Sequence, residues 1–236
     1  MRVRQRAVTW SLGLTTVLAV AITLSAGIGP VRIPPETVVK ILFNAVSVPA
    51  GIEIAPLSVA STLQLPVPTL RWRPAVAFPV DQTAETIIMR VRLPRIVLAA
   101  TVGFALAAAG TVMQGFFRNP MADPSIIGVS SGAAVGAVAA IVVPAAIPFG
   151  LGLRGAAFVG AILTAFAVYL IATEGGRTPV ATLLLAGVAI QAFLGAVIAA
   201  LQLYSGEGLR AVVHWLMGHL GNAGWSDVTI TLLIVP

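Results

Sequence analysis

Three arginines surround a proline near the middle of the chain, at Arg90, Arg92, Pro94 and Arg95. A guanidinium is always charged near neutral pH, and its planar set of N–H donors matches the two oxygens of a carboxylate. Pro94 restricts the backbone between Arg92 and Arg95 because its ring fixes φ. Arg92 and Arg95 are therefore chemically suited to bind acidic groups. The alternative is that they keep their charges in water while their stems cover the end of an apolar helix.

Other groups able to do chemistry are few. The sequence has no cysteine, and His214 and His219 stand five residues apart, so they do not share one face of a helix. We find no set of serine, histidine and carboxylate suited to catalysis, so we expect neither an enzyme nor a bound metal or cofactor. Gln191 is a polar group inside an uncharged run, where an amide either bonds a neighbouring helix or faces a water-filled path.

These residues must be positioned by apolar segments of unusual length. Hydrophobic residues make up 58% of the chain and charged residues only 9%, against about 25% charged in soluble domains. About 20 apolar residues cross a bilayer as a helix, because lipid offers the backbone no hydrogen-bond partners. We therefore predict an all-α polytopic membrane protein in a lipid bilayer. Lys, Arg, Asp and Glu are absent from residues 7–31, 96–117, 124–153, 155–173, 178–206 and 228–236.

The apolar runs predict five complete transmembrane helices and part of a sixth. The sixth begins at Trp225, and the nine residues after Asp227 are too few to cross. We therefore expect residues 1–236 to form one transmembrane domain that is incomplete at its C-terminal end. A shorter helix is expected at Leu209–Leu220. The five complete helices are expected at residues 7–29, 96–117, 130–143, 155–172 and 180–203.

Residues 30–89 interrupt this pattern. They hold nine of the sixteen prolines, and prolines at that density exclude a regular membrane helix. We predict an external, proline-rich loop that carries one amphipathic helix, at Glu36–Val46, where apolar residues recur at helical spacing.

Small residues recur at helical spacing on two of the predicted helices. In lipid such residues let helix backbones approach closely. We expect them to pack helices and not to bind substrate. They are Gly103 and Gly110 on one helix, and Gly128, Gly132 and Gly136 on the next.

A polar turn separates these two helices, with Asn119, Pro120, Asp123 and Pro124. Proline keeps the residue before it extended, and the Asp123 side chain is suited to cap the helix that follows. We expect the turn to have a structural role.

The distribution of arginines predicts the orientation of the chain. Arg2, Arg4 and Arg6 precede the first apolar run, and positive residues favour the cytoplasmic side. We expect the N-terminus in the cytoplasm and residues 30–95 outside. The sequence pI of about 11.3 does not indicate nucleic-acid binding, because the arginines are spread along loops and form no basic stripe.

Six segments, in order along the chain, resemble the FecCD-type permeases, which are the membrane subunits of ABC importers for ferric siderophores, haem and vitamin B12. The likeness covers residues 90–236 well and residues 1–35 loosely, and residues 44–88 look like an insertion. Any one segment is a weak signal, but six in the same order are specific. The segments are Arg92–Arg95, Gly110 with Met113 and Gln114, Arg118–Pro124, Gly128–Ala133, Leu183–Ala189 and Trp215–Gly218.

The resemblance implies partners and roles for several residues. It implies a ten-helix permease that forms a homodimer, a separate ABC ATPase, and a periplasmic or lipoprotein substrate-binding protein on which Arg92 and Arg95 dock. The helix that carries Gly187 and Gln191 would line the channel. Val180 and Ala181 fall at the cytoplasmic gate, where the vitamin B12 importer has small hydroxyl residues. Because of this difference, the resemblance does not decide which residues form the gate.

The function implied is that of a plasma-membrane permease subunit that moves a ferric siderophore or related metal chelate and does no chemistry itself. The family's ATPase-coupling segment follows the sixth helix, so a non-transporting fragment is one alternative. The other alternative is an ion-coupled secondary transporter. Such a transporter would place an ionisable residue within a span, and the charge-free runs contain none.

Overall fold

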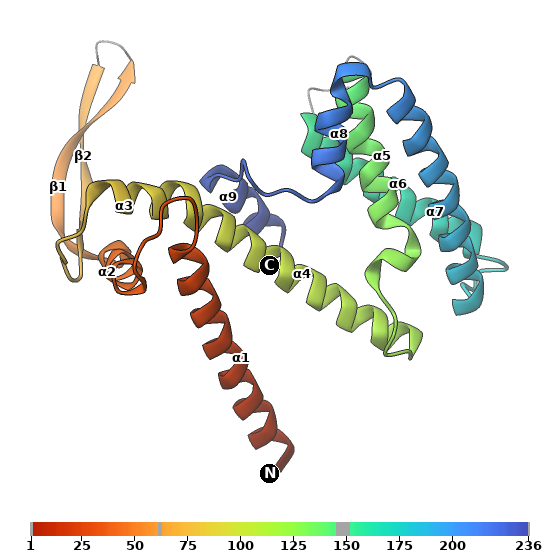
Figure 1. Cartoon of the computed structure of the whole chain (residues 1–236), viewed down its shortest axis with the longest axis horizontal. Helices are drawn as coiled ribbons and strands as arrows, with labels where there is room; N and C mark the ends of the chain where they lie inside the picture. Colours follow the sequence, from red (N-terminus) through yellow and green to blue (C-terminus); the bar gives the residue numbers. More distant parts are fainter. Residues whose placement is uncertain (1, 61–62, 145–151, 236) are drawn as a thin grey trace. The chain divides into compact units, whose positions relative to one another are not determined.

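The computed structural model describes residues 2–60, 63–144 and 152–235, and most of them are helical (Figure 1). They form two compact units, one of residues 1–100 with 223–236 and the other of residues 101–222. The boundary between the units falls inside helix α4 (Leu93–Phe117). The predicted all-α fold is confirmed only in part, because the chain is mostly helical but also contains one β-hairpin.

The first unit has a small apolar core at the C-terminal end of α1. This core forms because α2 places its buried residues Val38 and Ile41 beside Ala26 and Ile88. The amphipathic helix predicted at Glu36–Val46 is present as α2. The helices of this unit are α1 (Arg2–Gly27), α2 (Pro35–Ala45), α3 (Gln82–Thr86), the π-helical turn η1 (Ile87–Arg92), the start of α4, and α9 (Trp225–Ile234).

The proline-rich segment contains an element that the sequence analysis did not predict. Strands β1 (Ser47–Ala60) and β2 (Leu63–Pro74) form an antiparallel hairpin that pairs Ser47 with Pro74 at its base. Each strand of a two-stranded sheet has one free edge, so prolines are tolerated at positions where no ladder donor is needed. The segment at residues 44–88 is therefore built mainly as a β-hairpin followed by helix.

The second unit is a helical bundle, in which α5, α6 and α7 lie side by side (Figure 1). Val168 and Ala172 of α6 pack against Ala186 of α7 in its apolar cluster. Most of the link between the helices predicted at residues 130–143 and 155–172, including Pro148 and Gly150, lies outside the described residues. The elements are η2 (Pro124–Ile127), α5 (Val129–Val142), α6 (Gly152–Ala172), α7 (Val180–Leu203), η5 (Gly206–Gly208) and α8 (Leu209–Leu216), together with the remainder of α4.

Four helices in the described part of the chain are long and apolar enough to cross a bilayer. The predicted count of five complete spans is not confirmed. α5 has 14 residues, which gives a rise of about 21 Å against a hydrocarbon core of about 30 Å. The four candidate spans are Arg4–Gly27, Gln82–Phe117, Gly152–Ala172 and Val180–Leu203.

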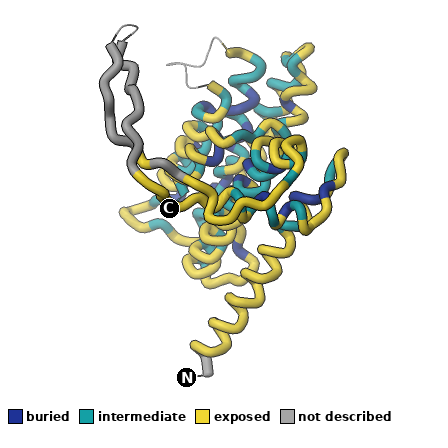
Figure 2. The backbone as a smooth tube through the Cα atoms, turned by 90° about the vertical axis from the view of Figure 1, so that its left-hand side faces the viewer, coloured by how far each residue is buried: buried dark blue, intermediate teal, exposed yellow. Residues whose placement is uncertain are grey.

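The long helices are largely uncovered by the rest of the chain. α1 is exposed along most of its length (Figure 2), and its large apolar side chains include Trp10 at 71% exposed. A soluble protein rarely exposes so much contiguous apolar surface. The described chain is therefore a multi-pass membrane protein, whose apolar helix faces require lipid or further protein.

The π-helical turn η1 leaves one backbone carbonyl for a partner outside the helix. Residues five apart are paired here, as the bond from the Leu93 N–H to the Ile88 carbonyl shows. In that register the next donor, at Pro94, would serve Met89, but proline has no N–H. The Trp225 indole donates to the Met89 carbonyl instead, over 2.9 Å.

Substituting Trp225 with phenylalanine should lower the free energy of unfolding by about 1–2 kcal/mol, because a donor is lost while a ring is kept. Thermal unfolding of the detergent-solubilised protein measures the change. Trp10→Phe on exposed α1 is the matched control. Equal unfolding midpoints for the two variants would contradict the role assigned to Trp225.

Candidate functional site

Arg92 and Arg95 line one cavity of about 480 Å³ in the first unit. Its remaining walls come from the loop after α1, which includes Gly29 and Val31, and from the apolar side of η1. The two arginines differ in their surroundings, since Arg92 is half-buried whereas Arg95 is exposed. The cavity therefore has one arginine in its wall and one that is open to solvent.

The Arg92 guanidinium is bonded to the end of α1. Its Nη1 donates to the Ala26 carbonyl over 2.6 Å, and its Nη2 donates to the Val31 carbonyl. The last carbonyls of a helix lack partners within the helix and carry partial negative charge, so a cation is favourable there. In the described part of the chain, Arg95 has neither a hydrogen bond nor an ion pair.

The polar turn predicted at residues 119–124 is held by its own side chains. The Asn119 Oδ1 accepts from the Met121 N–H over 2.9 Å, and the Gln114 side chain donates to the Pro120 carbonyl over 3.0 Å. These bonds fix the chain reversal after α4 and agree with the structural role expected for this turn.

Asp123 caps the short helix η2, and not α5 directly. Its Oδ1 accepts from the Ser125 N–H over 2.8 Å. Hydrogen bonds from the Ser125 side chain and then from its backbone N–H lower the pKa of Asp123 below its usual value. The carboxylate therefore stays ionised and keeps this cap at neutral pH.

Gln191 and Gly187 fasten α7 to η2. The Gln191 Nε2 donates to the Ile126 carbonyl over 2.7 Å. A Cβ at Gly187 would lie only 2.3 Å from that same oxygen. Of the two roles considered for Gln191, the hydrogen bond to a neighbouring element is the one present. Val180 and Ala181 are exposed at the first turn of α7.

Glycines let α5 and α6 approach backbone to backbone. A Cβ at Gly136 would lie 2.1 Å from the Ala156 carbonyl oxygen, and a Cβ at Gly160 would lie 2.3 Å from the Gly132 oxygen. Gly128, before α5, has φ of 78°, a left-handed conformation that favours glycine. Gly160 was not singled out from the sequence, although it belongs to an uncharged run.

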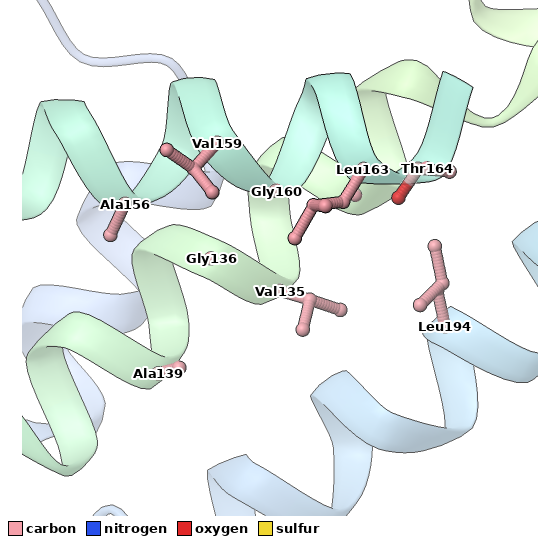
Figure 3. Close-up of a pocket in the computed structure, with 10 residues that line it drawn as sticks. Val135, Gly136, Ala139, Ala156, Val159, Gly160, Leu163, Thr164 and Leu194 are labelled. Atoms are coloured by element: carbon pink, nitrogen blue, oxygen red, sulfur yellow. The ribbon is translucent and has the colours of Figure 1, made fainter. Parts of the chain in front are cut away.

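A cavity of about 330 Å³ lies beside this contact, between α5, α6 and α7 (Figure 3). Val135, Leu163 and Leu194 line it, and Thr164 is a polar residue in its wall. With almost no hydrogen-bonding groups, the cavity is not suited to hold a polar solute.

Gly103 and Gly110 of α4 make no such close contact between helices. The described structure places nothing within 4 Å of a Cβ at either position.

No group of three or more metal-binding side chains occurs in the described residues. The His214 and His219 rings are 4.2 Å apart between centroids and tilted by 58°. The two rings are in contact, with His214 in the last turn of α8 and His219 in the segment that follows α8.

Uncovered apolar helices and close glycine contacts are features of a polytopic membrane protein. The model of the FecCD transport family matches residues 17–236, so the chain belongs to that family.

Known relatives are transport permeases for different cargoes. The cobalamin import system permease protein BtuC of Halobacterium salinarum is 48% identical over 235 residues, covering 98% of this chain and 63% of its own length. The hemin transport system permease protein HmuU of Yersinia pestis is 43% identical, covering 63% of this chain and 46% of its own length. This chain thus spans less than two thirds of the curated relatives that it matches.

The fold also matches a solved structure. An inward-facing conformation of a metal-chelate type ABC transporter is 30% identical and superposes with a TM-score of 0.61. The match covers 94% of this chain and 58% of that chain. The fold of the chain is therefore similar to that of an ABC transporter permease.

Proposed function

We propose that the chain is the membrane-spanning part of an ABC importer that moves a metal chelate across the plasma membrane, driven by a separate ATPase. Family membership over residues 17–236 is the observation that carries this proposal. The subunit does no chemistry. It offers a path whose two sides open in turn as the ATPase and the substrate-binding protein favour different states. A homodimer would place this path between two copies.

The substrate class that we favour is a large metal chelate of the cobalamin type. The Halobacterium salinarum relative, which covers almost all of this chain, is named for cobalamin import. A ferric siderophore is the second candidate, because the family includes an Fe(3+)-citrate permease from Bacillus subtilis that is 39% identical over 144 residues. Both are metal complexes far larger than an inorganic ion.

Ion coupling is disfavoured by the composition of the helices. Coupling to a proton or sodium gradient normally requires an ionisable side chain at membrane depth. Residues 96–117, 155–173 and 178–206 contain no Lys, Arg, Asp or Glu. The energy for transport would therefore come from outside this chain.

Vesicles that contain the permease with its ATPase and binding protein test the proposal. We expect ATP on the side of the vesicle membrane that corresponds to the cytoplasm to drive accumulation of radiolabelled cobalamin on that side. A ferric siderophore should compete only weakly with cobalamin. Uptake driven by an ion gradient without ATP would overturn it. Siderophore uptake without cobalamin uptake would replace the favoured substrate with the second candidate.

Orientation is tested by single cysteines, since the chain has none of its own. With the N-terminus in the cytoplasm, Val76→Cys lies outside and Met121→Cys lies inside, and both positions are exposed. An impermeant thiol reagent added to whole cells should label only Val76→Cys. Labelling of Met121→Cys alone would reverse the proposed topology.

A further inference from the structure

A cavity at the C-terminal end of α1 combines one guanidinium with an apolar wall. We propose that this cavity binds an anionic phospholipid of the leaflet in which α1 ends, with Arg32 on the phosphate and the acyl chains along the apolar wall. Such a site concerns the lipid around the permease and is independent of the transported substrate.

The cavity has a volume of about 520 Å³ and lies where α1 passes into α2. Among its described lining residues, Arg32 alone is charged. Its apolar wall faces outward from the chain, because Leu24 is 48% exposed and Ile28 is 74% exposed. A charged group beside exposed apolar surface suits a ligand that has a polar head and an apolar chain.

The backbone holds Arg32 at the depth of the lipid headgroups. The span Arg4–Gly27 has 24 residues, so it rises about 36 Å and reaches slightly beyond a hydrocarbon core of about 30 Å. The Ile33 N–H donates to the Gly27 carbonyl over 3.1 Å, and this bond folds the loop back onto the last residue of the helix. Arg32 therefore lies beside the point where α1 leaves the hydrocarbon, which is where lipid phosphates are found.

The Arg32 guanidinium is free to bind a phosphate. It is exposed, and in the described part of the chain it makes neither a hydrogen bond nor an ion pair. Glu36 is the nearest acidic residue in the sequence, and its carboxylate lies 4.0 Å from the Lys40 ammonium, which offsets its charge. A guanidinium binds two phosphate oxygens at once, and positive side chains at a membrane surface attract anionic lipids.

Helix α2 carries an exposed apolar face that continues the membrane boundary. Val38 and Ile41, on its inner face, are buried in the core of the unit. Val39, Phe43 and Val46 are exposed, and their spacing of i, i+4 and i+7 places them on one face. α2 contacts the end of α1 and lies across it (Figure 1), as expected of an amphipathic helix in the surface of a bilayer. The cavity is therefore bordered by lipid-facing surface on both helices.

The experiment measures phospholipid binding to the purified, delipidated permease in detergent, as the mass of lipid retained on the intact protein. Phosphatidylglycerol is the anionic probe, and phosphatidylcholine with the same acyl chains is the neutral one. Inorganic phosphate is the third arm, because it shares the chemistry of the headgroup but has no chains. Arg32→Gln removes the proposed contact, and Arg73→Gln, at an exposed arginine of β2, is its matched control.

We expect the parent to bind phosphatidylglycerol about tenfold more tightly than phosphatidylcholine. Arg32→Gln should remove this preference, whereas Arg73→Gln should keep it. Leu24→Ser should weaken binding of both lipids about fivefold, because it removes apolar surface from the acyl chains. Leu14→Ser, at an exposed position of α1 that does not line the cavity, should bind both lipids as the parent does. An excess of inorganic phosphate should displace neither lipid.

Four results would overturn the proposal. Equal binding of the two lipids by the parent would exclude an anionic lipid site. Equal losses in Arg32→Gln and Arg73→Gln would show only a general attraction to a positive surface. Displacement of phosphatidylglycerol by inorganic phosphate would show a phosphate site. A lower unfolding midpoint in Arg32→Gln, with the parental lipid preference, would assign Arg32 to the stability of the fold instead.

Discussion

Gly136→Ala and Gly160→Ala should each separate α5 from α6 and lower the free energy of unfolding by about 2–3 kcal/mol. The added methyl group would meet backbone oxygens at 2.1 Å and 2.3 Å, and backbone cannot rotate away as a side chain can. Overpacking of this kind costs about 1–3 kcal/mol even where side chains can adjust. Unfolding of the purified protein in mixed micelles of detergent and denaturant measures the loss.

Gly195→Ala is the matched control for both variants. Gly195 lies within α7, and a Cβ there meets nothing within 4 Å in the described structure. Alanine favours a helix over glycine by up to about 1 kcal/mol, so this variant should be neutral or slightly more stable. Equal destabilisation of all three variants would show that the α5–α6 contact is not what the glycines serve.

Gly187→Ala should disrupt the contact between α7 and η2 and reduce import more than tenfold. The new Cβ would lie 2.3 Å from the Ile126 oxygen, which also accepts the Gln191 hydrogen bond. The substitution therefore displaces the backbone and breaks that bond together. Since α7 is proposed to line the channel, a shift of η2 along it should impair transport as well as stability.

Gln191→Leu separates the two effects. It removes the hydrogen bond but adds no atom at the close contact, so it should cost about 1–3 kcal/mol, the range for a buried group left without its partner. Gln202→Leu, on the same helix, is the control, because no hydrogen bond of the Gln202 side chain is present in the described residues. Import and unfolding are measured for each variant. Parental import by Gly187→Ala would exclude a functional role for this contact.

The two candidate site arginines show what residue type and spacing can predict and what they cannot. Arg92 and Arg95 are equivalent by residue type, and the family resemblance implies that both dock on the substrate-binding protein. Only the tertiary structure separates them, because the partners of Arg92 lie more than 60 positions earlier, at Ala26 and Val31. A side chain's nearest acceptor depends on the path of the whole chain, which residue type does not encode.

The glycine pairs likewise differ in a way that the sequence alone does not predict. Gly103 and Gly110, like Gly132 and Gly136, recur at a spacing that places them on one face of a helix, yet only the second pair meets another backbone in the described structure. Spacing along a helix predicts which residues share a face. It does not predict which element, if any, covers that face.

The sequence by itself determined the class of protein and the positions of most helices. Long uncharged runs must be helical in lipid, where each backbone group needs a partner within its own segment, and α7 begins and ends at the predicted residues 180 and 203. Only the tertiary structure revealed the β1–β2 hairpin, the bonds from Arg92 to Ala26 and Val31, and the bond between Trp225 and Met89. The Arg92 and Trp225 bonds join segments far apart in sequence, so they depend on packing between elements and not on local propensity. The hairpin joins neighbouring segments, but prolines in both strands argue against a strand when the sequence is read alone.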